Sequence, residues 1–192
     1  MPAPLVERGA EISGTTALRP TRVETGARYY DTDLGQQLIY TGSTDGWKPA
    51  AGVFAKEVTF TEVGGALTYT GSVTIPAGAT VLDVIVHATA LWDNAGAVTM
   101  KVGDATDDDG IYTGVNLKAT DLLAGESLSF AQSGGKAGAY NVGTNTHWTT
   151  RYLATARVIS GIITTASTGG SAGRTRMTVL YALPTITAAT SA

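Results

Sequence analysis

The sequence contains no cysteine, and charged side chains make up only 15% of its 192 residues. The missing cysteine excludes disulfide bonds, thiolate metal sites and a cysteine nucleophile. Long apolar runs are missing too: the longest, near residues 81–88 and 158–163, fall far short of the roughly 20 residues of a membrane helix. The start, Met1-Pro2-Ala3-Pro4, lacks the basic and apolar segments of a secretion signal. We therefore expect no membrane partner.

Acidic residues are absent from the last third of the chain. All 16 of them lie at or before Glu126, so the first 126 residues carry a net charge of −8 and the remainder +5. The five late cations are scattered, whereas nucleic-acid-binding proteins usually show a dense basic patch. We therefore expect no nucleic acid as partner. Opposite charge on two parts of one chain suits contacts between copies, because complementary potentials orient partners.

The chain is rich in glycine, threonine and alanine, with 24 glycines and 43% hydrophobic residues. Threonine favours strands, and glycine favours turns. So little charge on a chain this apolar is typical of a protein that buries part of its exterior against neighbours.

A two-residue alternation of apolar side chains begins near residue 53 and predicts strands to the end of the chain. Its clearest stretch, Val81–Trp92, predicts one buried row of Leu82, Val84, Val86, Ala88, Ala90 and Trp92. Further buried rows are predicted at Val98, Met100 and Val102; at Tyr152, Ala154, Ala156, Val158 and Ile162; and at Met177, Val179 and Tyr181. About eight strands, with only residues 117–126 favouring a helical turn or two, predict an all-β fold: an antiparallel, jelly-roll-like β-sandwich.

The first 50 residues differ from the rest. Residues 1–36 lack apolar periodicity and contain several prolines and glycines, which predicts an extended N-terminal arm. Residues 37–48 predict a small hairpin, with a strand at Leu38–Tyr40, a turn at Gly42–Gly46 and Trp47 after it. We expect an arm and attachment hairpin over residues 1–50 and a β-sandwich over residues 51–192.

Residues 14–48 contain Arg19-Pro20, then Gly26-Ala27-Arg28-Tyr29-Tyr30-Asp31-Thr32, then Tyr40, Gly42 and Trp47. This order resembles a short module of bacteriophage tail-fibre, spike and head-decoration proteins. Strings such as Ile75–Val81 and Val102–Gly110 also resemble jelly-roll-like virion proteins. The resemblance implies a homo-oligomer, commonly a trimer, attached to a capsid or tail. It also implies attachment or interface roles for Arg19, Pro20, Tyr29, Tyr30, Asp31, Tyr40 and Trp47.

The predicted function is therefore structural: a capsid decoration or head-fibre subunit of the virion, assembled in the host cytoplasm, with no enzymatic activity and no cofactor. We expect the arm to bind the major capsid protein or another virion protein, and the sandwich to oligomerise. The alternative is a tail-fibre or receptor-binding module for host glycan, with Tyr140, His147 and Trp148 as its aromatic surface. The same three residues also suit an oligomer or core contact.

Two further motifs resemble functional sites. Asp104, Asp107 and Asp109 are candidate ligands for a cation such as calcium, although aspartates are also favoured in solvated turns. The EF-hand pattern fails, because Ala105 and Asn116 would occupy its first and last ligand positions. Gly169-x-Ser171-x-Gly173 matches the letters of a serine-hydrolase elbow, but no histidine or acid follows it, so we interpret it as a hairpin loop.

Overall fold

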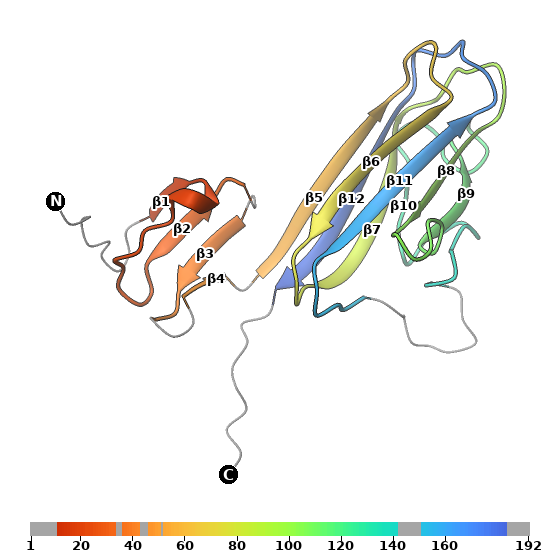
Figure 1. The fold of residues 1–192 in the computed structure, drawn as a ribbon. Coiled ribbons are helices and arrows are strands. Elements are labelled where there is room, and N and C mark those ends of the chain that lie inside the picture. Colours follow the sequence, from red (N-terminus) through yellow and green to blue (C-terminus); the bar gives the residue numbers. More distant parts are fainter. Residues whose placement is uncertain (1–10, 34–35, 43–45, 51, 142–150, 184–192) are drawn as a thin grey trace. The chain divides into compact units, whose positions relative to one another are not determined.

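The computed structural model describes residues 11–33, 36–42, 46–50, 52–141 and 151–183. Over these residues the protein is all-β, and its one helix is the short 3-10 turn η1 (Thr16–Leu18) (Figure 1). They fall into two compact units divided after Phe54: the first also takes in Leu183, and the second runs from Ala55 to Ala182. Among the described residues, no helix is long and apolar enough to cross a membrane.

The first unit is a small four-stranded sheet. Its strands, in the order β1-β2-β3-β4, are β1 (Glu11–Gly14), β2 (Arg28–Asp31), β3 (Gln36–Tyr40) and β4 (Trp47–Pro49). β1 and β2 are parallel, and the other neighbours are antiparallel. The pairing of β3 with β4, with Tyr40 opposite Trp47, confirms the predicted hairpin. The predicted arm is more folded than expected, because its residues 11–14 and 28–31 supply two strands.

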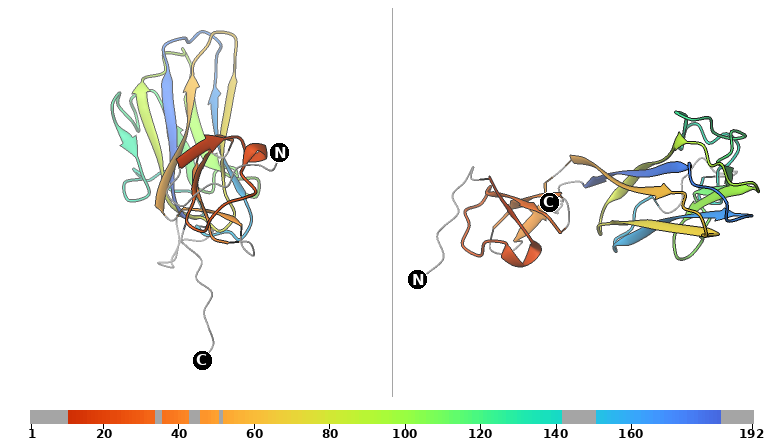
Figure 2. Two further views of the ribbon diagram at one scale, coloured as in Figure 1. Left: turned by 90° about the vertical axis from the view of Figure 1, so that its left-hand side faces the viewer. Right: turned by 90° about the horizontal axis from the view of Figure 1, so that it is seen from above.

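The second unit is a sandwich of two sheets (Figure 2). Its strands are β5 (Gly52–Thr61), β6 (Thr68–Ile75), β7 (Thr80–Ala90), β8 (Val98–Gly103), β9 (Tyr112–Asn116), β10 (Ser127–Leu128), β11 (Arg157–Thr165) and β12 (Arg174–Leu183). The sheet orders are β10-β7-β12-β5 and β6-β11-β8-β9. Two four-stranded sheets whose strands cross repeatedly from one sheet to the other form a jelly roll. The predicted jelly-roll-like sandwich is confirmed.

The space between the two sheets is filled by alternate residues of their strands. The rows predicted on β8 and β12 are confirmed, since their side chains are at most 1% exposed: Val98, Met100, Val102, Met177, Val179 and Tyr181. On β7 the same holds for Val84, Val86 and Ala88. Over these stretches strict alternation gave the correct buried face, whereas Ala90 of the predicted β7 row is only half-buried.

The predicted row was wrong at Leu82, which is 37% exposed while Val81 is buried. The register between β7 and β12 shifts at this point, because Leu180 lies opposite Asp83 and the next residue, Tyr181, lies opposite Val81. Such a bulge inserts one residue and reverses the alternation beyond it. The direction of Leu82 therefore depends on its partner strand.

The row predicted from Tyr152 to Ile162 was also wrong. Ile159 and Ile163 are buried, whereas Tyr152 is 57% and Val158 46% exposed. Both faces of this strand carry apolar residues. The sequence therefore fits either face toward the core almost equally well, and alternation alone does not decide between them. The strand begins at Arg157, whose side chain points inward, and this fixes the register.

Residues 117–126 form turns instead of the predicted short helix. Ala119 has a φ of 65°, which is left-handed, and the Asp121 carboxylate accepts the Asn116 backbone N–H at 2.6 Å. Asp121 therefore closes a tight turn after β9.

Candidate attachment site

The first unit is closed by a buried carboxylate at the end of β2. The side chain of Asp31 is 0% exposed and accepts the Arg19 Nε–H at 2.7 Å and the Thr16 hydroxyl at 2.9 Å. Its other oxygen accepts the backbone N–H of Asp33 at 3.0 Å. A buried carboxylate is stable only when its oxygens are paired in this way. Asp31 thus fastens η1 and the segment after it to β2; we call this contact the Arg19–Asp31 latch.

Three aromatic rings form the second connection within this unit. The Trp47 ring centroid lies 5.6 Å from that of Tyr29 and 5.5 Å from that of Tyr40, and both ring pairs are inclined. The Trp47 indole N–H donates to the Pro20 carbonyl at 3.1 Å, and the Tyr29 hydroxyl donates to the Thr15 carbonyl at 2.8 Å. Inclined rings at these distances attract each other beyond the effect of burial.

Burial is what raises the pKa of Tyr29, with a further contribution from the nearby Asp31 carboxylate. The phenol is therefore neutral and serves as a hydrogen-bond donor. The cluster ties three strands to the loop that contains Pro20.

Of the seven predicted attachment residues, six make contacts inside the unit: Arg19, Pro20, Tyr29, Asp31, Tyr40 and Trp47. Tyr30 alternates with buried Tyr29 on β2 and is 44% exposed. Leu18, which lies on η1 and is 70% exposed, was not among the predicted residues. Among the described residues before β5, the exposed large apolar side chains are therefore Leu18 and Tyr30, and the other six predicted residues hold the unit together.

The predicted cation ligands Asp104, Asp107 and Asp109 are not one cluster. Asp104 accepts the Arg157 Nε–H at 3.0 Å, the Tyr140 hydroxyl at 2.9 Å and the backbone N–H of Thr106 at 2.9 Å. Burial alone would raise the pKa of Asp104, but these hydrogen bonds and the charge of Arg157 outweigh it and lower the pKa. The carboxylate is occupied by the protein itself, and it joins three distant segments of the second unit.

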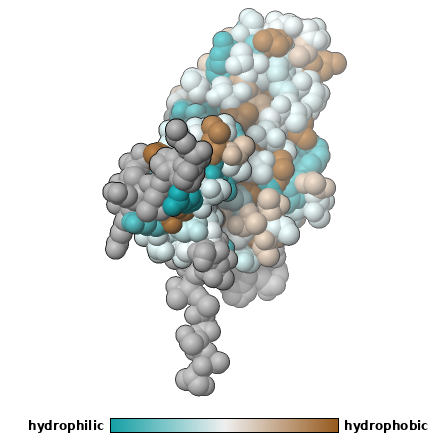
Figure 3. Space-filling model, turned by 60° about the vertical axis from the view of Figure 1, so that its left-hand side comes forward, coloured by the Kyte–Doolittle hydropathy of each residue, from teal (hydrophilic) through white to brown (hydrophobic). Residues whose placement is uncertain are grey.

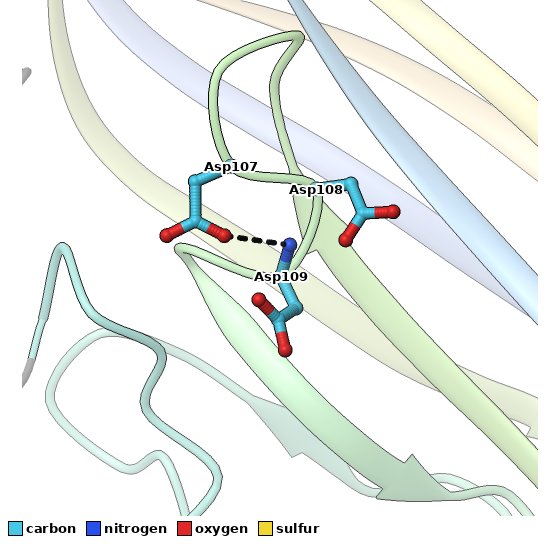
Figure 4. Close-up of side chains that lie close together, drawn as sticks. All are labelled: Asp107, Asp108 and Asp109. Atoms are coloured by element: carbon cyan, nitrogen blue, oxygen red, sulfur yellow. Dashed lines mark hydrogen bonds between the residues drawn. The ribbon is translucent and has the colours of Figure 1, made fainter.

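The carboxylates that do lie together are those of Asp107, Asp108 and Asp109, whose oxygens are within 4.8 Å of one another (Figure 4). Asp108 pairs with Lys101, and Asp109 accepts the Thr113 hydroxyl at 3.0 Å. A hydrogen bond with Asp109 raises the pKa of Asp107, while the bond from Thr113 lowers that of Asp109. Carboxylate oxygens at this spacing suit a hard cation. A solvated acidic turn between β8 and β9 explains the same arrangement equally well.

The predicted glycan surface is described only at Tyr140, because His147 and Trp148 lie outside the described residues. The Tyr140 ring packs against Gly110, where a side chain would not fit, and Arg157 lies 5.5 Å from the ring centroid. Burial and the hydrogen bond to Asp104 raise the pKa of Tyr140 to about 12. Its hydroxyl is therefore committed to the interior contact with Asp104.

A buried acid that the sequence analysis missed connects loops of the second unit. Glu62 is 1% exposed, and its carboxylate accepts the backbone N–H groups of Asp93 at 3.1 Å, Asn94 at 3.2 Å and Gly173 at 2.9 Å. Each donor is a backbone group 31 or more residues away, so local sequence held no signal for it. Glu62 is a structural residue that fixes the loops after β5, β7 and β11.

No protein-family model matches the chain, and no curated protein sequence is similar to it. Several solved structures resemble its fold, among them three phage capsids. The acid-stable capsid of Helicobacter pylori bacteriophage KHP30 matches with 15% identity and a TM-score of 0.46, over 69% of this chain and 89% of that chain. The cyanophage Pam1 capsid matches with 20% identity and 0.46, over 75% and 98%. The Ralstonia phage GP4 capsid matches with 17% identity and 0.42, over 72% and 88%. At these TM-scores the likeness is too distant to indicate a shared function.

Proposed function

We propose that the protein is a structural component of a bacteriophage particle, a decoration or head-fibre subunit of the capsid. The first unit attaches it to the particle, and the β-sandwich associates with other copies. The observation that carries this proposal is the agreement between motif and fold in the first unit. The landmarks that resemble a phage attachment module, from Arg19-Pro20 to Trp47, are the residues that make the latch and the aromatic cluster.

The second unit supports the same proposal at the level of architecture. Jelly rolls are a common fold of viral capsid domains, but they also serve as lectins, so fold alone does not decide the function. Among the described residues, the glycan-binding alternative has no observation of its own, since the Tyr140 hydroxyl is used internally. The structural role is therefore the function that we propose.

The surface also suits assembly. In the view of Figure 3 most of the surface drawn in colour is pale, which corresponds to residues of intermediate hydropathy. The outward residues of β6 are Thr68, Thr70, Ser72 and Thr74, none of them charged. A surface without strong charge loses little hydration when it is covered by a neighbour.

The test is binding of the full-length protein to particles assembled without it. The double substitution Leu18→Asp with Tyr30→Asp is expected to weaken binding at least about tenfold, because it places charge on the exposed apolar side chains of the first unit. The matched control is Val63→Asp with Leu67→Asp in the second unit, where the side chains are 52% and 50% exposed. If the control weakens binding as much as the first pair, attachment through the first unit is wrong.

A further inference from the structure

The edges of the two sheets in the second unit are not equally protected. An edge strand presents unpaired backbone groups to which another strand can add, and proteins usually block such edges. The four edge strands here are β5, β6, β9 and β10. The contacts and charges of the described residues along each edge show which edge strand is available to a partner.

Two edges are blocked by the chain itself. Along β9, the Thr113 N–H donates to the Lys136 carbonyl at 2.9 Å, and Tyr112 forms a bridge with Ala137. β10 is only two residues long, and the Phe130 N–H just after it donates to the Asp83 carboxylate at 2.8 Å. Neither strand offers a continuous row of free backbone groups.

The other two edges differ in charge. β5 carries Lys56 and Glu57, and Glu57 is 58% exposed at its side chain and lies 3.8 Å from Arg176. Charges on an edge oppose the addition of another strand. β6 reads Thr-Tyr-Thr-Gly-Ser-Val-Thr-Ile, with no charged residue and no proline over eight positions. β6 is therefore the long edge strand whose own side chains include neither a charge nor a proline.

Two hydrogen bonds show which backbone groups of β6 face outward. The Leu67 carbonyl accepts the Thr165 N–H at 2.9 Å, so odd-numbered residues bond to β11. The Thr74 carbonyl instead accepts the Lys56 ammonium at 2.9 Å, on the opposite side. Because the direction alternates along a strand, four residues direct their backbone groups to the open edge: Thr68, Thr70, Ser72 and Thr74.

We infer that this edge pairs with the β6 edge of a second copy of the chain, antiparallel and about a twofold axis at Gly71. In that register Thr70 lies opposite Ser72 of the second copy, and Thr68 lies opposite its Thr74. It is the one centre that pairs all four edge-facing residues with each other. Moving the axis to Ser72 would place Pro76, which has no N–H, opposite Thr68.

The side chains agree with this pairing. Inward residues stay inward in both copies, and the outward pairs are threonine with serine and threonine with threonine, which stabilise a sheet. The central Thr70–Ser72 pairs need no rearrangement. The outer pairs form when Lys56 releases the Thr74 carbonyl, and both four-stranded sheets then become one continuous sheet.

This inference depends on the self-association in the proposed function, and it names the strand through which two copies associate. A twofold contact uses the same patch on both copies and joins two of them. It therefore predicts a dimer, whereas the resemblance to phage attachment proteins predicts a trimer.

The experiment measures the mass of the full-length protein by light scattering over a dilution series, for two double variants. Thr70→Lys with Ser72→Lys places like charges opposite each other twice across the axis. Thr70→Lys with Ser72→Glu puts charges at the same positions but places opposite charges together. The dissociation constant of the like-charge dimer is expected to be about tenfold or more above that of the opposite-charge dimer. Both variants alter exposed side chains, and circular dichroism checks that both fold.

Two results would overturn the pairing: a wild-type protein that is a monomer or trimer at every concentration, or two variants that dissociate equally. The failure of this contact is distinguishable from failure of the proposed function. If the protein is a monomer that still binds particles, the β6 contact is disproved and attachment through the first unit stands. If the protein is a dimer that binds no particle, attachment is disproved and the β6 contact stands.

Discussion

The two units of this protein are stabilised in different ways. Among its described residues, the first has few fully buried side chains, including Tyr29, Leu38 and the charged Asp31, and it relies on specific polar and aromatic contacts. The second buries apolar residues from all eight strands between its two sheets. A small unit cannot gain much from burial alone, whereas a sandwich of this size can. Single substitutions should therefore act through different causes in the two units.

The largest expected effect is in the second unit, at Gly103. A Cβ at this position would lie 2.0 Å from the Asp107 carbonyl oxygen and 2.5 Å from the Asp108 carbonyl carbon, so backbone must move to accept it. We expect Gly103→Ala to destabilise the second unit by about 3 kcal/mol, or roughly 10 °C in Tm. Calorimetry measures this. Gly169→Ala is the control, since nothing lies within 4 Å of its Cβ, and an equal loss there would contradict the packing argument.

The next effect is local to the first unit. Asp31→Ala leaves Arg19, the Thr16 hydroxyl and the Asp33 N–H without their shared acceptor. Arg19 is 24% exposed at its side chain, so solvent relieves part of the cost, and we expect a loss of about 2 kcal/mol. Hydrogen exchange should become faster in β2 and β3 and stay unchanged in β7 and β12.

The control for this variant is Thr32→Ala, at the exposed neighbouring position. Equal acceleration of exchange in both units after Asp31→Ala would mean that the latch does not act locally.

A pH titration tests what the Asp104 carboxylate contributes to the stability of the second unit. The pKa of Asp104 is lowered in the folded protein, so its contribution to stability is present above its unfolded pKa, near 4, and is lost as the pH falls through the folded pKa. The wild type should therefore exceed Asp104→Asn in free energy of unfolding at pH 7, and the difference should shrink as the pH falls toward 2. Urea denaturation at each pH measures it. A difference that is constant over this range would contradict the assignment.

The smallest expected effect concerns the acidic turn at Asp107–Asp109. Lys101 and Thr113 already contact Asp108 and Asp109, so we expect about 5 mM calcium to change the Tm of the second unit by less than about 1 °C. Thermal melts with calcium and with a chelator test this. A clear rise in Tm that Asp109→Asn abolishes would identify a cation site.

The strands could be predicted where alternation depends only on local sequence. Met100 on β8 and Val179 on β12 follow it strictly and are buried. Leu82 and Val158 could not be predicted, because a bulge against β12 and the inward position of Arg157 set their direction. Register depends on the partner strand, which the sequence of one strand does not contain.

The candidate sites show the same limit. The latch joins residues only 12 apart and belongs to a compact motif, so its members could be identified together. The bond between Arg157 and Asp104 spans 53 residues, and for that reason Asp104 was predicted as a free cation ligand. The exposure of Leu18 could not be predicted either, because an apolar residue is usually a candidate for the core.

The most direct test of the proposed structural role is quantitative mass spectrometry of phage particles purified from a culture in which this chain is expressed. We expect peptides from both units, in a fixed ratio to the major capsid protein. We also expect this ratio to stay the same after the particles are washed in high salt. Absence of the chain from purified particles, with its presence only in the lysate, would contradict it.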